Sequence, residues 1–297
     1  MREMPPLGCD PGAWINNPAG ELLQMAYESI SVEPVSPNIG AEVSEIDLTK
    51  PLTNLQVKEL HDAISEYLVL FFRDQRISPG DLKALGQHFG DLHEHVGGQG
   101  TTARKMDGNP IVRILHYDEN SEQIAGGEVW HTDQSCAKIP PMGSILYLHT
   151  VPPDGGGDTM FASMYAAYDA LSPRMQEYLE GLTSVQDGTL SFGPGAPVTT
   201  HPIIVKNPRD GRKSIYMTPF ITTKINELSP DESKAIIEFL GKHCAHPDFQ
   251  FRFRWRPHSI AFWDNRYTHH RALWDYYPNV RSGFRVQVQG SQPPLAA

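Results

Sequence analysis

The sequence lacks the features that mark disulfide-stapled, zinc-ribbon and membrane-spanning proteins. It has three cysteines, Cys9, Cys136 and Cys244, widely spaced and without a CxxC pair. This odd, unpaired set argues against a disulfide framework and a zinc ribbon. No apolar stretch approaches the roughly 18 residues of a transmembrane helix, and the start, MREMPPLGCDPGAW, has no apolar signal-peptide core. We therefore expect a cytoplasmic protein with no membrane partner.

Basic residues are scarce relative to acidic ones. The chain has 25 Lys plus Arg against 35 Asp plus Glu, a formal net charge of −10 at pH 7, and no basic run. An acidic surface repels phosphate backbones, so we expect no nucleic-acid partner. A few buried arginines still let an acidic protein bind anions, and we expect a small-molecule substrate. The sequence leaves open whether the chain forms a homo-oligomer.

Strands and turns are what the sequence has in abundance. Its 297 residues suit one large domain, and 25 glycines and 25 prolines favour turns over long helices. Residues 1–28 lack periodicity, so we expect an N-terminal arm followed by a single domain over 29–297. Helical spacing predicts helices over 55–67, 79–89, 164–181 and 230–243.

β-Branched and aromatic runs make up most of the remaining chain. They predict a hairpin over 203–217 and strands over 30–34, 68–72, 111–117, 144–151, 249–255, 259–264 and 283–290. This order predicts a mainly β fold with inserted helices, either a sandwich or a cupin-like jelly roll, that is, a double-stranded β-helix.

Three His-x-Asp triplets are candidates for a metal site. They begin at His116, His131 and His246. In a strand, residues i and i+2 face the same side, so such a triplet can direct an imidazole and a carboxylate to one metal. The third triplet follows a helix and contains a strand-breaking proline, and the first ends a strand before a polar loop. We therefore favour His131 with Asp133.

A two-histidine, one-carboxylate triad needs another histidine from a neighbouring strand and leaves three metal positions open. The stretch WDNRYTHHRA over 263–272 supplies two adjacent candidates, His269 and His270, after a buried strand. Alternation alone does not choose between them.

Two arginines follow at an even spacing, Arg281 and Arg285, on or beside the strand GFRVQVQG. Both can therefore project to one face. An arginine that faces the interior of a jelly roll is costly unless it meets an anion, and its fork suits a carboxylate. The alternative is a salt bridge at the rim with an Asp or Glu.

These stretches resemble the taurine dioxygenase and 2,4-dichlorophenoxyacetate dioxygenase family of iron(II)/2-oxoglutarate oxygenases. The similarity spans nearly everything after residue 30, in order. It rests on NIGAEVSEIDLTKPL, VLFFRDQRIS, FGDLHEH, VWHTD, PPDGGGDTMFASMYAAYDALS and WDNRYTHHRA. It implies a dioxygenase that uses Fe(II), 2-oxoglutarate and O2 to hydroxylate a small organic anion, with release of succinate and carbon dioxide.

The resemblance also implies roles for individual residues. The catalytic iron ligands are His131, Asp133 and His270, which selects His270 over His269. Thr159 and Arg281 hold the distal carboxylate of 2-oxoglutarate. Arg285 matches an arginine that binds the prime substrate, and the resemblance leaves open whether it serves 2-oxoglutarate instead. His95 matches a histidine that contacts the same substrate anion.

Departures from the taurine enzyme concern the substrate pocket. Gly127 and Gly98 stand where that enzyme has an Asn and a Tyr, Phe161 replaces a Trp, and the segment 186–200 is shorter. We therefore expect a substrate bulkier than taurine, such as a sulfonate, sulfate ester, aryloxyalkanoate or other carboxylate. Two other functions are compatible with the same residues. One is a catalytically silent jelly-roll binding protein, which the intact triad disfavours. The other is a zinc hydrolase, in which Arg281 would have no role.

Overall fold

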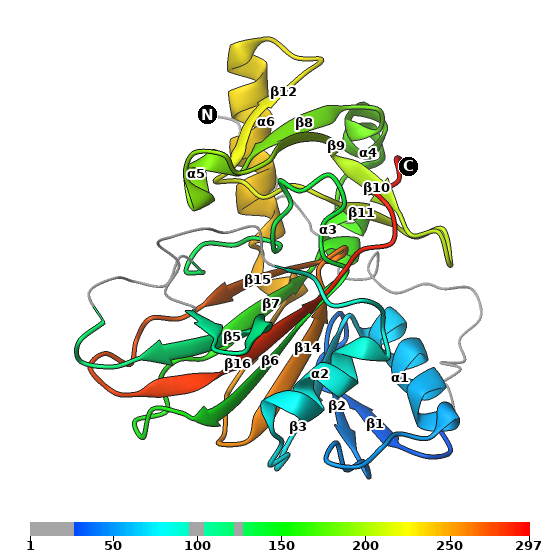
Figure 1. The fold of residues 1–297 in the computed structure, drawn as a ribbon. Coiled ribbons are helices and arrows are strands. Elements are labelled where there is room, and N and C mark those ends of the chain that lie inside the picture. Colours follow the sequence, from blue (N-terminus) through cyan, green and yellow to red (C-terminus); the bar gives the residue numbers. More distant parts are fainter. Residues whose placement is uncertain (1–26, 95–103, 122–126) are drawn as a thin grey trace, which may run out of the picture.

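Two β-sheets face each other across an apolar layer in the computed structural model, which describes residues 27–94, 104–121 and 127–297 (Figure 1). The large sheet has eight strands. In spatial order they are β1 (Ser31–Pro34), β2 (Ala41–Ser44), β3 (Val69–Phe72), β14 (Ser259–Asp264), β6 (Gly143–Thr150), β16 (Arg281–Val288), β5 (Asn109–Tyr117) and β4 (Arg104–Met106). The small sheet contains β13 (Gln250–Phe253), β7 (Thr159–Ser163) and β15 (Thr268–Ala272).

The layer between the sheets is aromatic. Phe71 of the large sheet stacks on Phe253 of the small sheet with ring centroids 4.0 Å apart, and Phe161 packs edge-on against Phe71 at 5.7 Å. These rings are fully buried, so they contribute a large share of the apolar area removed from water. The two sheets are thereby held as a sandwich, and the site lies where polar residues replace these rings.

Helices α1 (Asn54–Tyr67) and α2 (Pro79–Gln87) cover the outer face of the large sheet (Figure 1). Each begins with a capping box, from Thr53 and from Ser78, which satisfies backbone N–H groups of the first turn. Their apolar sides pack on outward-facing residues of β14 and β6 such as Ile145 and Phe262. The opposite, inward faces of those strands remain available for the site.

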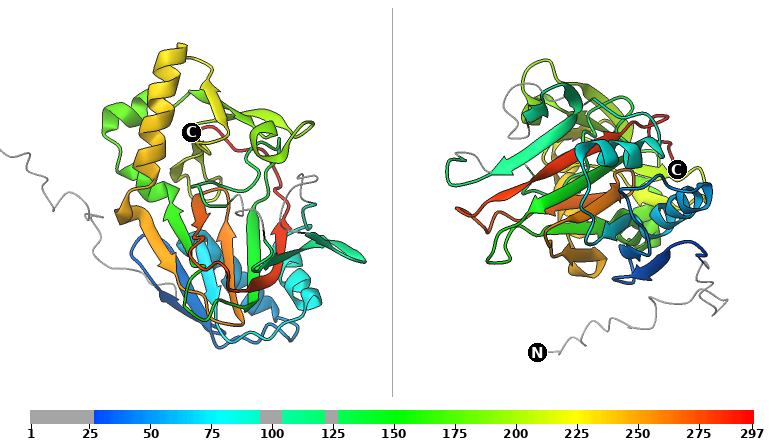
Figure 2. Two further views of the ribbon diagram at one scale, coloured as in Figure 1. Left: turned by 90° about the vertical axis from the view of Figure 1, so that its left-hand side faces the viewer. Right: turned by 60° about the horizontal axis from the view of Figure 1, so that its bottom comes forward.

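A segment inserted between β7 and β13 packs over one end of the two sheets, away from β1, β2 and β3 (Figure 2). Its elements are α3 (Met164–Asp169), α4 (Pro173–Leu179), β8 (Thr183–Asp187), α5 (Thr189–Phe192), β9 (Val198–Pro202), β10 (Ile204–Lys206), β11 (Lys213–Ile215), β12 (Thr222–Ile225), α6 (Pro230–Cys244) and the 3-10 turn Pro247–Phe249. α3, α6 and the β10–β11 hairpin share a third apolar cluster.

Most of the expected elements are present near their predicted bounds, and the mainly β composition with inserted helices is confirmed. The predicted helix over 164–181 is wrong as one element. It is two helices, because Ser172 caps a new one by accepting a hydrogen bond from the Met175 backbone at 3.3 Å. Pro173 has no N–H to continue the preceding helix, so the chain turns there.

Strands from both halves of the chain alternate in the large sheet. β3 pairs with β14, and β16 lies between β5 and β6. The expectation for residues 1–28 falls almost entirely outside the described residues. Among the helices of the described residues, none has the length and apolar character needed to cross a membrane.

Candidate metal centre

Two histidines face each other across the edge of the small sheet. His270 lies on β15, and His131 pairs with it as an isolated antiparallel bridge. The His131 N–H donates to the His270 carbonyl at 3.1 Å, and the His270 N–H donates back at 2.8 Å. Residues paired in this way project their side chains to the same side, and the two ring centroids are 4.2 Å apart. The backbone pairing therefore brings the two imidazoles together.

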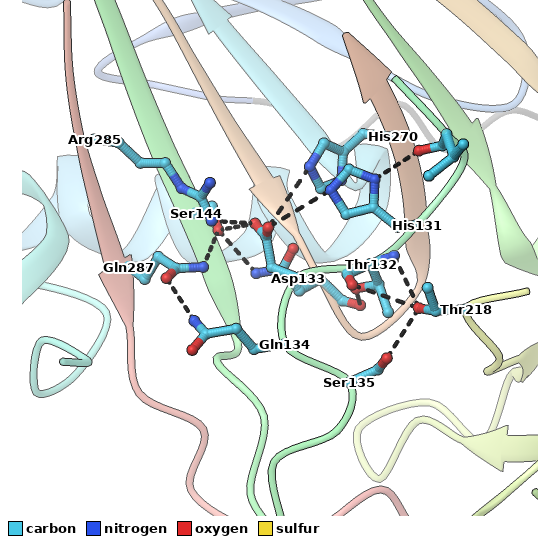
Figure 3. Close-up of polar contacts among 12 residues, drawn as sticks. His131, Thr132, Asp133, Gln134, Ser135, Ser144, Thr218, His270, Arg285 and Gln287 are labelled. Atoms are coloured by element: carbon cyan, nitrogen blue, oxygen red, sulfur yellow. Dashed lines mark hydrogen bonds and ion pairs between the residues drawn. The ribbon is translucent and has the colours of Figure 1, made fainter. Parts of the chain in front are cut away.

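Asp133 completes the group. Its Oδ1 lies 3.9 Å from Nε2 of His131 and 3.8 Å from Nε2 of His270 (Figure 3). One ligand atom from each of the three residues lies within 4.8 Å of the others. Two imidazole nitrogens and a carboxylate oxygen are the donor set of a facial triad, which suits a ferrous ion. The three residues favoured from the sequence are thus brought to one point.

The strand alternation that lets a His-x-Asp triplet share one metal does not hold at His131 and Asp133. Only His131 is β-paired, and the chain turns from Asp133 onward, with Gln134 at φ 49°. Asp133 is aimed by side-chain contacts instead of by strand alternation. Ser144 Oγ donates to its Oδ2 at 2.6 Å, and Ser144 itself accepts from the amide of Gln287 at 3.0 Å.

The environment favours the protonation states that bind metal. Burial lowers the pKa of both His131 and His270, so both rings are neutral near pH 7. Burial would raise the pKa of Asp133, but the nearby charge of Arg285 and the hydrogen bond from Ser144 hold it well below its usual range. His131 Nδ1 lies 2.7 Å from the Val129 carbonyl, a contact that assigns its proton to Nδ1 and leaves Nε2 as the electron-pair donor.

Aromatic rings form the wall behind the ligands. Trp263 lies 4.8 Å and Phe161 6.3 Å from the His270 ring, measured between centroids. Both are buried, so they limit ring rotation and keep water from that side. Gly127 also lies near the two histidines, because a Cβ there would lie 3.7 Å from His131 Cε1.

Arg281 is buried on the inner face of β16, 4% exposed, and its Nε donates to the Gly157 carbonyl at 3.1 Å. The rings of Trp255 and Tyr276 flank its guanidinium at 5.7 and 5.9 Å. Among the described residues no carboxylate forms an ion pair with it. A buried and unneutralised guanidinium fits the carboxylate of an incoming ligand.

Thr159, at the start of β7, contacts the same Trp255 side chain that flanks Arg281. Its Oγ1 accepts a hydrogen bond from the Trp255 indole at 3.0 Å, and the side chain is buried. Because a hydroxyl keeps its own hydrogen when it accepts, Thr159 can still donate to an anion. Trp255 therefore links Thr159 to the surroundings of Arg281.

Arg285 lies on the same inner face of β16 as Arg281, as its even spacing predicted. Its guanidinium makes an ion pair with Asp133, Nη2 to Oδ2, at 2.8 Å (Figure 3). The second arginine thus contacts the proposed ligand set directly.

The other expected residues have different outcomes. His95 and Gly98 fall outside the described residues. His269 is buried beside His270, and alternation along β15 turns its side chain to the other face. His116 pairs with Asp118 on the outer side of the sheet, and His246 lies at an exposed 3-10 turn, so neither of those triplets reaches the site.

Sequence reasoning missed the polar residues that support the triad. Ser144 and Gln287 are opposed on β6 and β16, and Gln134 donates to the Gln287 side chain at 2.7 Å. The signal was present, because Gln287 continues the period-2 series of Arg281 and Arg285. It became meaningful only once the pairing of the strands was known.

Known proteins are similar to this chain both in sequence and in fold. A model of the family described as "Taurine catabolism dioxygenase TauD, TfdA family" matches residues 31–287. An alpha-ketoglutarate-dependent sulfonate dioxygenase of Saccharomyces cerevisiae is 33% identical over 290 residues, which cover 89% of this chain and 68% of the relative. An alkylsulfatase of Acinetobacter baylyi is 27% identical over 289 residues, 91% of this chain and 88% of the relative.

A solved structure gives the same result for the fold. A taurine dioxygenase from Burkholderia xenovorans superposes with a TM-score of 0.79 at 34% sequence identity, and the match covers 90% of this chain and 91% of that one.

Proposed function

We propose, on the premise that this chain belongs to the taurine catabolism dioxygenase TauD, TfdA family, that His131, Asp133 and His270 are its iron(II) ligands. The chain is an iron(II)- and 2-oxoglutarate-dependent dioxygenase. When bound, iron(II), 2-oxoglutarate and oxygen supply the oxidation that hydroxylates a substrate carbon, with release of succinate and carbon dioxide. The observation that carries the assignment is the meeting of three ligand atoms within 4.8 Å.

The protein's own groups bind and orient the reactants. Neutral His131 and His270 offer nitrogen lone pairs, and Asp133 stays ionised because Arg285 and Ser144 stabilise its charge. Arg281 and Thr159 take the distal carboxylate of 2-oxoglutarate. Preorganised donors of this kind cost no rearrangement when the ligand arrives.

The prime substrate that we propose is a small organic anion, with sulfonates and sulfate esters first and carboxylates such as aryloxyalkanoates as alternatives. Relatives whose names specify sulfonate and alkyl sulfate substrates support this class. Arg285 supports it physically, because it adds a second cation on the inner face of β16. Gly127 leaves space where a side chain would otherwise approach His131.

The experiment is succinate release from 2-oxoglutarate with iron(II) under air, screened over sulfonates, sulfate esters, aryloxyalkanoates and small carboxylic acids. At least one sulfonate or sulfate ester should stimulate release, and omission of iron or oxygen should abolish it. Succinate release that no compound of these classes stimulates would contradict the proposed substrate class.

We also propose that residues 29–297 form one double-stranded β-helix domain after an N-terminal arm over 1–28, and that the protein works in the cytoplasm. The interleaving of early and late strands in the large sheet supports a single domain, since β3 pairs with β14. Limited proteolysis should leave one resistant fragment that begins near residue 29.

A further inference from the structure

Two loops meet beside the guanidinium of Arg281. The first, residues 152–158, leads into Thr159 at the start of β7, and the second, residues 273–280, leads into Arg281 at the start of β16. They meet where Nε of Arg281 donates to the Gly157 carbonyl at 3.1 Å. Each loop therefore leads into one of the two residues proposed to hold the distal carboxylate of 2-oxoglutarate.

The first loop contains three consecutive glycines, residues 155–157. Glycine has little conformational preference of its own, so the shape of this backbone depends on the contacts that it makes. Gly157 has a φ of 80°, and its N–H donates to Oδ1 of Asp275 at 2.7 Å. Asp275 of the second loop thus fixes the same residue whose carbonyl orients Arg281.

Asp275 is itself held in place by hydrogen bonds on either side of it along the chain. The Leu273 N–H donates to the Asp158 carbonyl at 2.9 Å, and the amide of Asn279 donates to Oδ2 of Asp154 at 2.7 Å. Both bonds join the second loop to the first. The Asp275 carboxylate is therefore carried by a backbone that is fixed relative to the glycines.

Two carboxylates beside a site for an anion would repel that anion. Here Arg252 of β13 balances both of them. Its Nε donates to Oδ2 of Asp158 at 2.7 Å, and its Nη2 lies 3.6 Å from Oδ2 of Asp275. Asp275 thus directs one oxygen to Arg252 and the other to Gly157, so an acidic residue can hold this loop with its charge balanced.

We propose that Asp275 is a positioning residue for the co-substrate: it fixes Gly157, and Gly157 fixes the guanidinium of Arg281 that takes the distal carboxylate of 2-oxoglutarate. The inference rests on the proposed function. A carboxylate gains nothing from direct contact with an anion, so Asp275 acts through the backbone. Without its hydrogen bond, the glycine run regains conformational freedom, and the Arg281 guanidinium loses its fixed orientation.

The test is anaerobic calorimetric titration of 2-oxoglutarate into iron(II)-loaded protein, with the affinity for iron(II) measured separately. The variants are Asp275→Ala and Asp275→Asn, and the Asp275 side chain is 47% exposed, so both should fold. The matched control is Asp210→Ala. Asp210 likewise accepts a backbone N–H, that of Arg212 at 2.9 Å, and is ion-paired with an arginine, Arg212, at 2.8 Å.

Asp275→Ala should weaken 2-oxoglutarate binding about threefold to tenfold, as loss of one hydrogen bond does, and leave the affinity for iron(II) unchanged. Asp275→Asn should bind 2-oxoglutarate within about twofold of the wild type, because the amide oxygen of asparagine can accept from the Gly157 N–H. Asp210→Ala should bind both iron(II) and 2-oxoglutarate like the wild type.

Wild-type affinity for 2-oxoglutarate in Asp275→Ala would overturn the proposal. Equal losses in Asp275→Ala and Asp275→Asn would overturn it too, because they would assign the effect to the charge shared with Arg252. A parallel loss of iron(II) affinity in Asp275→Ala would show a general structural role instead. The proposed function is tested separately by the wild type, and it fails if iron-loaded wild-type protein does not bind 2-oxoglutarate.

Discussion

Replacement of Arg281 by alanine should remove most of the affinity for 2-oxoglutarate. The side chain is 4% exposed and is fixed by its hydrogen bond to Gly157 and by two flanking aromatic rings. The guanidinium therefore binds the co-substrate in a site shielded from water, and the fixed side chain loses little conformational entropy on binding. Removal of such a partner leaves the ligand's carboxylate buried without compensation and costs about 2–5 kcal/mol, at least about 30-fold in the dissociation constant.

The assay is anaerobic titration of 2-oxoglutarate into iron-loaded protein. Arg281→Lys should restore little of the affinity for 2-oxoglutarate, because the ammonium group of lysine does not reproduce the two parallel N–H donors of arginine. Arg256→Ala is the matched control: it removes an exposed cation next to Trp255 without touching the buried side. Arg256→Ala should bind 2-oxoglutarate like the wild type. Unchanged affinity in Arg281→Ala, with the fold intact by circular dichroism, would refute the assignment.

Three further changes give sharp expectations. Gly157→Ala should weaken 2-oxoglutarate binding about tenfold, because Gly157 has a φ of 80° and an added Cβ would lie 2.9 Å from Arg281 Cδ. Gly211→Ala is the control, since Gly211 has a similar φ of 77° but nothing within 4 Å of an added Cβ, and it should leave 2-oxoglutarate binding unchanged. Arg285→Gln should raise the KM for the prime substrate more than that for 2-oxoglutarate, and equal damage in steady-state assays would assign it to the co-substrate. Burial opposes ionisation of Glu59, but three hydrogen bonds outweigh it and lower its pKa. Glu59→Gln should therefore lower the free energy of unfolding above about pH 4.5. The difference from the wild type, measured by urea denaturation, should shrink at lower pH. A difference that does not change with pH would show that the ionised carboxylate is not its cause.

Local patterns were sufficient for several features of the site. The even spacing of Arg281 and Arg285 predicted a shared face, and both arginines lie on the inner face of β16. The context of His131 selected the triplet that the structure places beside His270. The shared face of the two arginines was predictable because strand alternation is a property of the chain itself.

Other features depended on pairing between distant strands. Whether His269 or His270 faces inward is set by the bridge between His270 and His131, which no local period encodes. The Asp133 carboxylate is likewise oriented by a hydrogen bond from Ser144, a residue of the separate strand β6. The end of one helix and the start of the next at Pro173 is a different case. Ser172-Pro173 is a local helix-start signal, but the helical spacing that runs over 164–181 concealed it.

The most direct test of the metal centre is an anaerobic visible spectrum taken after addition of iron(II) and 2-oxoglutarate. Wild-type protein and His269→Ala should both develop the weak charge-transfer band of iron-bound 2-oxoglutarate, whereas His270→Ala should not. A wild-type protein without the band, or loss of the band in His269→Ala with its retention in His270→Ala, would contradict the proposed ligand set.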